Sequence, residues 1–126
     1  MKKIIKTQNA PAPIGPYNQA ILSGNTLYIS GQIAINPSTN ELVLSDIKTE
    51  TKQVMENLKA ILKEAKTDFS TVVKSSIFLS DMNNFGAINE VYGSYFEGLI
   101  APARETVEVS VLPKNVNVEI SMIAVI

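Results

Sequence analysis

The sequence contains no cysteine and no histidine in 126 residues. The protein therefore has no disulfide, no thiol nucleophile, and neither a Ser-His nor a Cys-His catalytic pair. The two absences also remove the usual ligands of zinc and iron, and no group of Asp and Glu residues has the spacing of an all-oxygen metal site. Any reaction must be carried by other side chains.

Strong charge and long apolar runs are absent as well. The formal net charge is −1, which gives no basic surface for nucleic acid or an anionic membrane. No segment approaches the ~20 apolar residues of a membrane-spanning helix, and the N-terminal segment MKKIIKTQNAPAP lacks the apolar stretch of a signal peptide. Since a cysteine-free chain fits a reducing compartment, we expect a cytoplasmic protein.

The residues that are present are those of an ordinary globular domain. Hydrophobic residues make up 45% of the chain and charged residues 18%, which is enough apolar material for a real core. No internal repeat, linker or low-complexity tract divides the sequence. We therefore predict a single domain over residues 1–126.

Two segments have the three- and four-residue apolar spacing of amphipathic helices. Ser45 or Asp46 can cap the first helix, whose lysines and glutamates fill the opposite face; its apolar positions are Ile47, Thr51, Val54, Leu58, Ile61, Leu62 and Ala65. Asp81 or Asn83 can cap the second helix and Gly98 can end it; its apolar stripe is Phe85, Ile88, Tyr92 and Phe96.

Segments rich in β-branched residues predict strands around these helices. Residues 2–7 come first, residues 20–35 predict a hairpin around Ser23-Gly24-Asn25, residues 71–80 lie between the helices, and two strands close the chain on either side of a turn at 112–115. The order β-β-β-α-β-α-β-β predicts an α+β fold. We expect a two-layer sandwich in which two helices cover one face of a mixed six-stranded sheet.

The last strand alternates in a way that suggests a second packed surface. One side, which we place under the helices, carries Val118, Ile120, Met122 and Ala124; the other mixes Glu119 and Ser121 with Ile123 and Val125. A mixed sheet face of this kind often packs against another copy of the protein. A solvated face with stray aliphatic residues is the alternative.

Arg104 and Glu119 are opposite charges within the two apolar closing strands. Arg104 follows Ala101-Pro102-Ala103, and a proline-stiffened entry fixes where an arginine points, so that it can bind a carboxylate through two hydrogen bonds. Glu119 can orient or deprotonate a water molecule, or donate a proton if its pKa is raised. We expect both on the interface face, although each alone is more often solvated or salt-bridged.

Four further residues are candidates for lining a pocket. Tyr17, after the loop sequence IGP, can form one wall with its hydroxyl facing inward, or can cover the core. Ser30-Gly31 lies inside a strand, where glycine indicates close approach of a ligand or another chain, or a simple bulge. Asn89 lies beside the apolar stripe of the second helix and can reach inward or face solvent.

Five segments, in order along the chain, resemble the Rid family of reactive-intermediate deaminases, also called the YjgF family, and within it the RidA-type branch. They are IGPYNQAI, LYISGQIAINPSTNEL, FLSDMNNFGAINEVY, APARETVEV and LPKNVNVEISMIAV. The resemblance implies a fold like that of the trimeric bacterial chorismate mutase. It also implies a homotrimer with a cleft between neighbouring subunits, and no cofactor or metal.

The activity implied by the resemblance is hydrolysis of short-lived enamines and imines, such as 2-aminoacrylate and its imine tautomer, to 2-oxo acids and ammonia. The protein would be a 2-iminobutanoate/2-iminopropanoate deaminase. The family's arginine corresponds to Arg104, which would bind the substrate carboxylate. Its glutamate corresponds to Glu119, which would position water together with the backbone carbonyl of Thr106. The other pocket positions correspond to Tyr17, Ser30, Gly31 and Asn89.

The chain departs from the family pattern at three positions. Many members carry cysteine where this chain has Thr106, which leaves a carbonyl role intact but excludes thiol chemistry. Glu105 stands where a small residue is common, and strand alternation predicts that it points away from the pocket. Asn40 replaces a glycine, and asparagine tolerates the left-handed turn.

Other classes of function stay open at this point. The same arginine cleft could serve a non-catalytic regulator that binds 2-oxo acids. An RNA-cleaving translation inhibitor or a holdase chaperone is a third class associated with parts of the family. The slightly acidic balance and the lack of histidine disfavour RNA cleavage.

Overall fold

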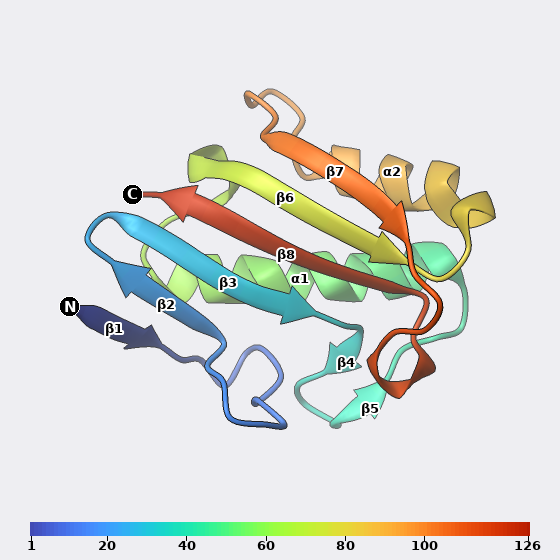
Figure 1. Ribbon diagram of the computed structural model, residues 1–126, viewed down its shortest axis with the longest axis horizontal. Coiled ribbons are helices and arrows are strands. Elements are labelled where there is room, and N and C mark those ends of the chain that lie inside the picture. The colour runs from blue at the N-terminus through green and yellow to red at the C-terminus, as the bar shows by residue number, and fades with distance from the viewer.

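Six strands form one mixed sheet in the computed structural model, which describes residues 1–126. In the sheet order β1-β2-β3-β8-β6-β7 they are Lys2–Ile5, Ala20–Ser23, Thr26–Gln32, Val118–Val125, Val72–Leu79 and Ala103–Glu108. β6 and β7 are parallel, and the other neighbouring pairs are antiparallel. Helices α1 (Ile47–Glu64) and α2 (Phe85–Ser94) both lie behind the sheet in Figure 1. This arrangement confirms the predicted two-layer α+β sandwich.

The apolar stripe predicted for α1 anchors this helix to the sheet. Asp46 is the cap, because its carboxylate accepts a hydrogen bond of 2.8 Å from the backbone N–H of Thr49. Each aliphatic side chain buried here contributes roughly 1.5–3 kcal/mol. Glu50 is also completely buried, so the expectation that the helix glutamates all face solvent is wrong. The fully buried aliphatic residues of α1 are Val54, Leu58, Ile61 and Leu62.

α2 is shorter than its apolar stripe suggests. A single 3-10 turn, Met82–Asn84, precedes it, and Asp81 caps that turn by accepting a 2.9 Å hydrogen bond from the backbone N–H of Asn83. The helix ends at Ser94. Gly98, which we expected to end it, adopts a positive φ of 74° in the turn that follows. Neither α1 nor α2 combines the length and apolar character needed to cross a membrane.

A small hairpin lies beside the main sheet, where the sequence predicted only the end of a strand at Ile35 and a turn after it. β4 (Ile35–Asn36) and β5 (Glu41–Leu42) form a separate two-stranded sheet. Asn40, in the turn between them, has a φ of 60°, as expected for asparagine in place of glycine. Strands of two residues carry too little alternation to be recognised in a sequence.

No helix covers the other face of the sheet in the single chain (Figure 1), and we call it the open face. Its end at Phe78 packs against a small buried cluster that includes Leu112 and Val116. Strand register places a row of side chains across it. Ile4 and Tyr28 of this row are 58% and 50% exposed. The alternation predicted for β8 is confirmed by its burial, whereas packing of the open face against another copy stays a prediction. The row consists of Ile4, Ile21, Tyr28, Ile123 and Lys74.

Candidate functional site

Arg104 is oriented by α2. It lies at the start of β7, paired with Ser75 of β6, and its Nη1 donates a 2.7 Å hydrogen bond to Oδ1 of Asn89. Its Cζ lies 5.1 Å from the ring centre of Tyr92 and 5.7 Å from that of Phe85, an arrangement that stabilises an exposed cation by ~0.5–1 kcal/mol. α2 therefore fixes the guanidinium, while Arg104 remains exposed to an incoming anion.

Tyr92 is a neutral support beneath this guanidinium. Its ring is buried, and its hydroxyl donates a 2.9 Å hydrogen bond to Oγ of Ser75. Burial raises the pKa of Tyr92, although the Ser75 hydrogen bond and the charge of Arg104 act in the opposite direction. The phenol therefore stays protonated and does not compete with an anion for Arg104.

Thr106 lies two residues along β7 and faces the same side as Arg104. Its Oγ1 is buried and has no hydrogen-bond partner in the chain. Most buried hydroxyl groups are paired. Thr106 Oγ1 is therefore an unsatisfied polar atom on the side of β7 that carries Arg104.

Glu119 is an unpaired acid on the open face. It projects from β8 beside Phe78 of β6, and neither of the two ion pairs of the chain involves it. The side chain is partly buried, and this burial raises the pKa of its carboxyl above the usual value. An acid in this state can exchange a proton with a water molecule or a ligand.

Gly31 provides the space that the Glu119 carboxyl occupies. The register of β3 against β8 shifts between Ile29 and Gln32, so Ser30 and Gly31 form a bulge. A Cβ atom on Gly31 would lie 2.6 Å from Oε2 and 2.7 Å from Cδ of Glu119. The close approach that the sequence indicates at this glycine is therefore that of the Glu119 side chain.

Ser30 connects this bulge to the loop that carries Tyr17. Its Oγ donates a 2.6 Å hydrogen bond to the carbonyl of Asn18, and its backbone N–H donates one of 2.9 Å to the carbonyl of Gln19. Tyr17 is 47% exposed and lines a small hollow of about 30 Å³ together with Gly31. Gly31 thus adjoins both the Glu119 side chain and the hollow that Tyr17 lines.

In one chain, Arg104 and Glu119 lie on opposite faces of the sheet, so the expectation that both occupy the open face is wrong. Arg104 pairs with the buried Ser75, whereas Glu119 pairs with Phe78 on the other side. In the edge strand β7 it is the aliphatic Val107, 39% exposed, that lies on the open face, and this turns Arg104 toward α2. Two half-sites result: the Arg104 half-site of Asn89, Arg104 and Thr106, and the Glu119 half-site of Tyr17, Ser30, Gly31 and Glu119.

Two residues that support the Arg104 half-site were predicted only as part of the core. Phe85 and Tyr92 both lie against the guanidinium. With Asn89 they follow the spacing i, i+4 and i+7 on one face of a helix. That spacing is the signal that could have identified all three as contacts of one side chain.

Glu105 points away from Arg104, as strand alternation predicts. Its carboxylate accepts a hydrogen bond from the hydroxyl of Ser76 and forms an ion pair of 2.9 Å with Lys74. The Ser76 hydrogen bond, followed by Lys74, holds the pKa of Glu105 below its usual value. Glu105 therefore does not compete for Arg104.

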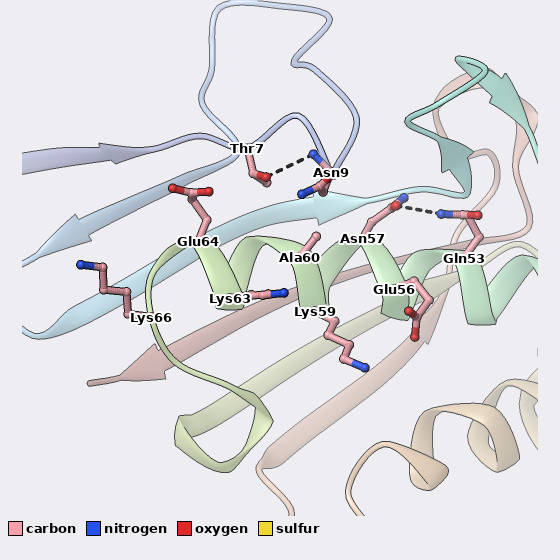
Figure 2. Close-up of a pocket in the computed structure, with 10 residues that line it drawn as sticks. All are labelled: Thr7, Asn9, Gln53, Glu56, Asn57, Lys59, Ala60, Lys63, Glu64 and Lys66. Atoms are coloured by element: carbon pink, nitrogen blue, oxygen red, sulfur yellow. Dashed lines mark hydrogen bonds between the residues drawn. The ribbon is translucent and has the colours of Figure 1, made fainter.

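The largest hollow of the single chain lies elsewhere. Figure 2 shows it between the segment after β1 and the outer side of α1, with a volume of about 520 Å³. It contains no candidate residue, and water screens its charges because all of them are exposed. Its charged residues are Glu56, Lys59, Lys63, Glu64 and Lys66.

Known proteins place the chain in one family. The model of the Endoribonuclease L-PSP family matches residues 7–126. A RutC family protein of Pyrococcus horikoshii is 56% identical over 124 residues, which cover 98% of both chains. The 2-iminobutanoate/2-iminopropanoate deaminase of Mus musculus is 48% identical over 125 residues, which cover 99% of this chain and 92% of the mouse protein. A Rid family protein of unknown function from Yersinia pestis has a TM-score of 0.98 at 50% identity over the full length of both chains. This chain belongs to the Rid family, also called the YjgF family, as the resemblance in its sequence indicated.

Proposed function

We propose that this protein hydrolyses short-lived 2-imino acids and their enamine tautomers to 2-oxo acids and ammonia. The observation that carries the proposal is the exposed guanidinium of Arg104, which Asn89 and two aromatic rings hold ready for an anion. The unpaired, partly buried acid of Glu119 supplies the proton-transfer group that hydrolysis needs. The mouse relative carries the name of this activity.

Arg104 would bind the carboxylate of the substrate. Its Nη1 already donates to Asn89, and the guanidinium has further N–H donors for a two-pronged hydrogen bond. A planar fork fixes both the position and the direction of a small carboxylate. The reacting imine carbon, one bond away, is then held at a defined place.

Hydrolysis of the imine needs one water molecule and a proton carrier. Water adds to the electrophilic carbon of the protonated imine, and Glu119 accepts the proton that the water releases. Glu119 then returns this proton to the amino nitrogen of the resulting carbinolamine. The C–N bond breaks, the hydroxyl oxygen becomes the carbonyl oxygen of the 2-oxo acid, and the hydroxyl proton leaves with the ammonia as ammonium. The carboxylate of Glu119 is thereby regenerated. Acid–base assistance of this kind contributes roughly 10²–10⁴-fold, in addition to proximity.

A second copy of the chain would complete the site. Because the half-sites lie on opposite faces, we propose a homotrimer in which the Arg104 half-site of one subunit meets the Glu119 half-site of the next. A closed ring of identical contacts forms one site at each interface. The exposed side chains of Tyr28 and Val107 on the open face supply apolar surface for a neighbour to cover.

A coupled assay tests the activity. A threonine dehydratase generates the imines from threonine or serine, and release of 2-oxo acid and ammonia is followed with and without this protein. We expect faster release when the protein is present. If 2-oxobutanoate binds, as measured by calorimetry, but release is not accelerated, the regulator is the correct function and the deaminase is not.

The dependence on pH tests the role of Glu119. Glu119 must be ionised to accept a proton from water, and burial raises its pKa. We therefore expect kcat/KM to rise with pH through a midpoint above the usual glutamate value. Glu119→Gln should abolish this rise of kcat/KM with pH and lower kcat by roughly 10²–10⁴-fold. If kcat/KM of Glu119→Gln still rises with pH through the same midpoint, the titrating group is not Glu119.

Mixing two inactive variants tests the shared site. Arg104→Ala and Glu119→Gln subunits, refolded together in equal amounts, should regain activity, because a site can take its arginine from one subunit and its acid from the other. Random assembly of a ring restores about a quarter of the sites. Each variant refolded alone is the control, and sedimentation reports the number of subunits. A mixture no more active than its components would show that the site is not shared.

A further inference from the structure

Glu50 is a buried carboxylate that the mechanism above does not use. It lies in the first turn of α1 and is completely buried. A glutamate is almost never buried to this degree unless it is fully paired, because an unpaired charge loses its hydration. Its partners therefore identify what this residue does in the fold.

All partners of Glu50 lie at the entry to β8. Its Oε2 accepts hydrogen bonds from the backbone N–H groups of Asn117 at 2.8 Å and Val118 at 3.3 Å. Its Oε1 accepts one of 2.8 Å from Nδ2 of Asn117. The carbonyl of Asn117 in turn accepts a 3.1 Å hydrogen bond from the backbone N–H of Ser80, just after β6. One carboxylate thus joins α1 to two consecutive residues where β8 begins.

The next residue along β8 is Glu119. We propose that Glu50 is a positioning residue, which holds the start of β8 against α1 and so fixes Glu119 at the bulge that contains Gly31. This inference rests on the function proposed above. The fit at the bulge is close, since a Cβ on Gly31 would lie 2.6 Å from Oε2 of Glu119. A shift of β8 by about one ångström is therefore enough to move the acid out of place.

Glu50→Leu removes every acceptor and tests the inference. We expect kcat to fall on the order of 10²-fold with little change in KM, because the carboxylate-binding Arg104 half-site lies on the other face. The midpoint pH of the rise in kcat/KM should also move down toward the usual pKa of glutamate, because a displaced Glu119 carboxyl loses its burial. Its flanking residues, Gly31 of β3 and Phe78 of β6, carry no titratable group. The charged groups on the same face, Lys74 and Glu105, are paired with each other, and they and Tyr17 of the loop are unchanged by the substitution. If Glu50 had a purely structural role, the substitution would lower the stability of the protein and leave the midpoint pH of kcat/KM unchanged.

Glu50→Gln provides the matched rescue. Its Oε1 can accept from the backbone N–H groups, and its Nε2 can donate to Oδ1 of Asn117 once that side-chain amide turns over. We therefore expect kcat and the midpoint pH of kcat/KM to be close to those of the unsubstituted protein. Thr51→Val is the control, because Thr51 is equally buried but its hydroxyl bonds only within α1, to the carbonyl of Ile47 at 2.7 Å.

The possible outcomes separate the inference from the proposed function. The inference is overturned if Glu50→Leu is folded and both its kcat and the midpoint pH of its kcat/KM are unchanged. It is also overturned if Glu50→Gln loses as much activity as Glu50→Leu. If Glu50→Leu does not fold, Asn117→Ala is used instead, because it removes the side-chain hydrogen bond to Glu50. It should shift the midpoint pH of kcat/KM in the same direction by a smaller amount, and the absence of any shift overturns the inference. If the unsubstituted protein releases no 2-oxo acid, the proposed function fails. A ¹³C titration of the Glu119 carboxyl in the same variants then decides the inference without substrate.

Discussion

Arg104→Ala should abolish deamination while the protein stays folded and assembled. The variant loses the only cation of the Arg104 half-site, and removing one partner of a hydrogen-bonded charge pair commonly costs 2–5 kcal/mol. We therefore expect kcat/KM in the coupled assay to fall by about 10²–10³-fold or more. Because Arg104 is exposed, thermal unfolding and sedimentation should be close to those of the unsubstituted protein.

Two further variants separate charge from geometry at this position. Arg104→Lys keeps the charge but loses the planar fork and its stacking on aromatic rings, so it should recover little activity. Lys48→Ala is the control, because it removes an exposed cation that pairs with Glu90 of α2 at 2.6 Å and touches neither half-site. Full activity in Arg104→Ala would exclude the carboxylate-binding role, whereas full activity in Arg104→Lys would show that charge alone is sufficient and that the planar fork is not needed.

Gly31→Ala should remove activity with almost no loss of stability. The new Cβ would lie 2.6 Å from Oε2 and 3.0 Å from Cγ of Glu119, so the acid must move. The clash is with the end of a flexible side chain rather than with backbone, and Gly31 has no positive φ. The fold therefore tolerates alanine, and the loss of backbone freedom in the unfolded state offsets part of any strain, by about 0.4–1 kcal/mol.

The expected result for Gly31→Ala is a fall in kcat on the order of 10²-fold, since a displacement of about one ångström has an effect of this size. Gly93→Ala in α2 is the matched control, because its added Cβ would meet no atom within 4 Å beyond its chain neighbours and the backbone of its own helix. It should retain activity and gain ~0.5–1 kcal/mol of stability as a helix residue. If chemical denaturation shows Gly31→Ala folded and the assay shows it fully active, Glu119 does not act at its observed place.

The fold could be predicted wherever buried residues recur at a regular spacing in the sequence. The stripe from Val54 to Leu62 and the alternation of β8 are both visible in the sequence, because each places its apolar residues on one side. β4 and β5 left no trace because two residues cannot alternate. The burial of Glu50 could not be predicted either, because its partners are 67 and 68 residues away in the chain.

The candidate site could be predicted residue by residue, but not its geometry. Arg104 and Glu119 stand out as charges in apolar strands, and the resemblance to the family indicated the same two residues. Their faces were misassigned because alternation defines two sides of a strand without saying which one the helices cover. In the edge strand β7 the aliphatic Val107 faces outward, and only the pairing of Arg104 with the buried Ser75 resolves the choice.

The separation of the two half-sites allows them to change independently. α2 supplies the hydrogen-bond partner and both aromatic rings of the Arg104 guanidinium, and none of the Glu119 half-site. Substitutions at Phe85 or Asn89 can therefore alter which anions are recognised while the acid, its bulge and the loop beside it are inherited unchanged. Within one fold, new ligand preferences can thus evolve on a single helix face while the Glu119 half-site stays the same.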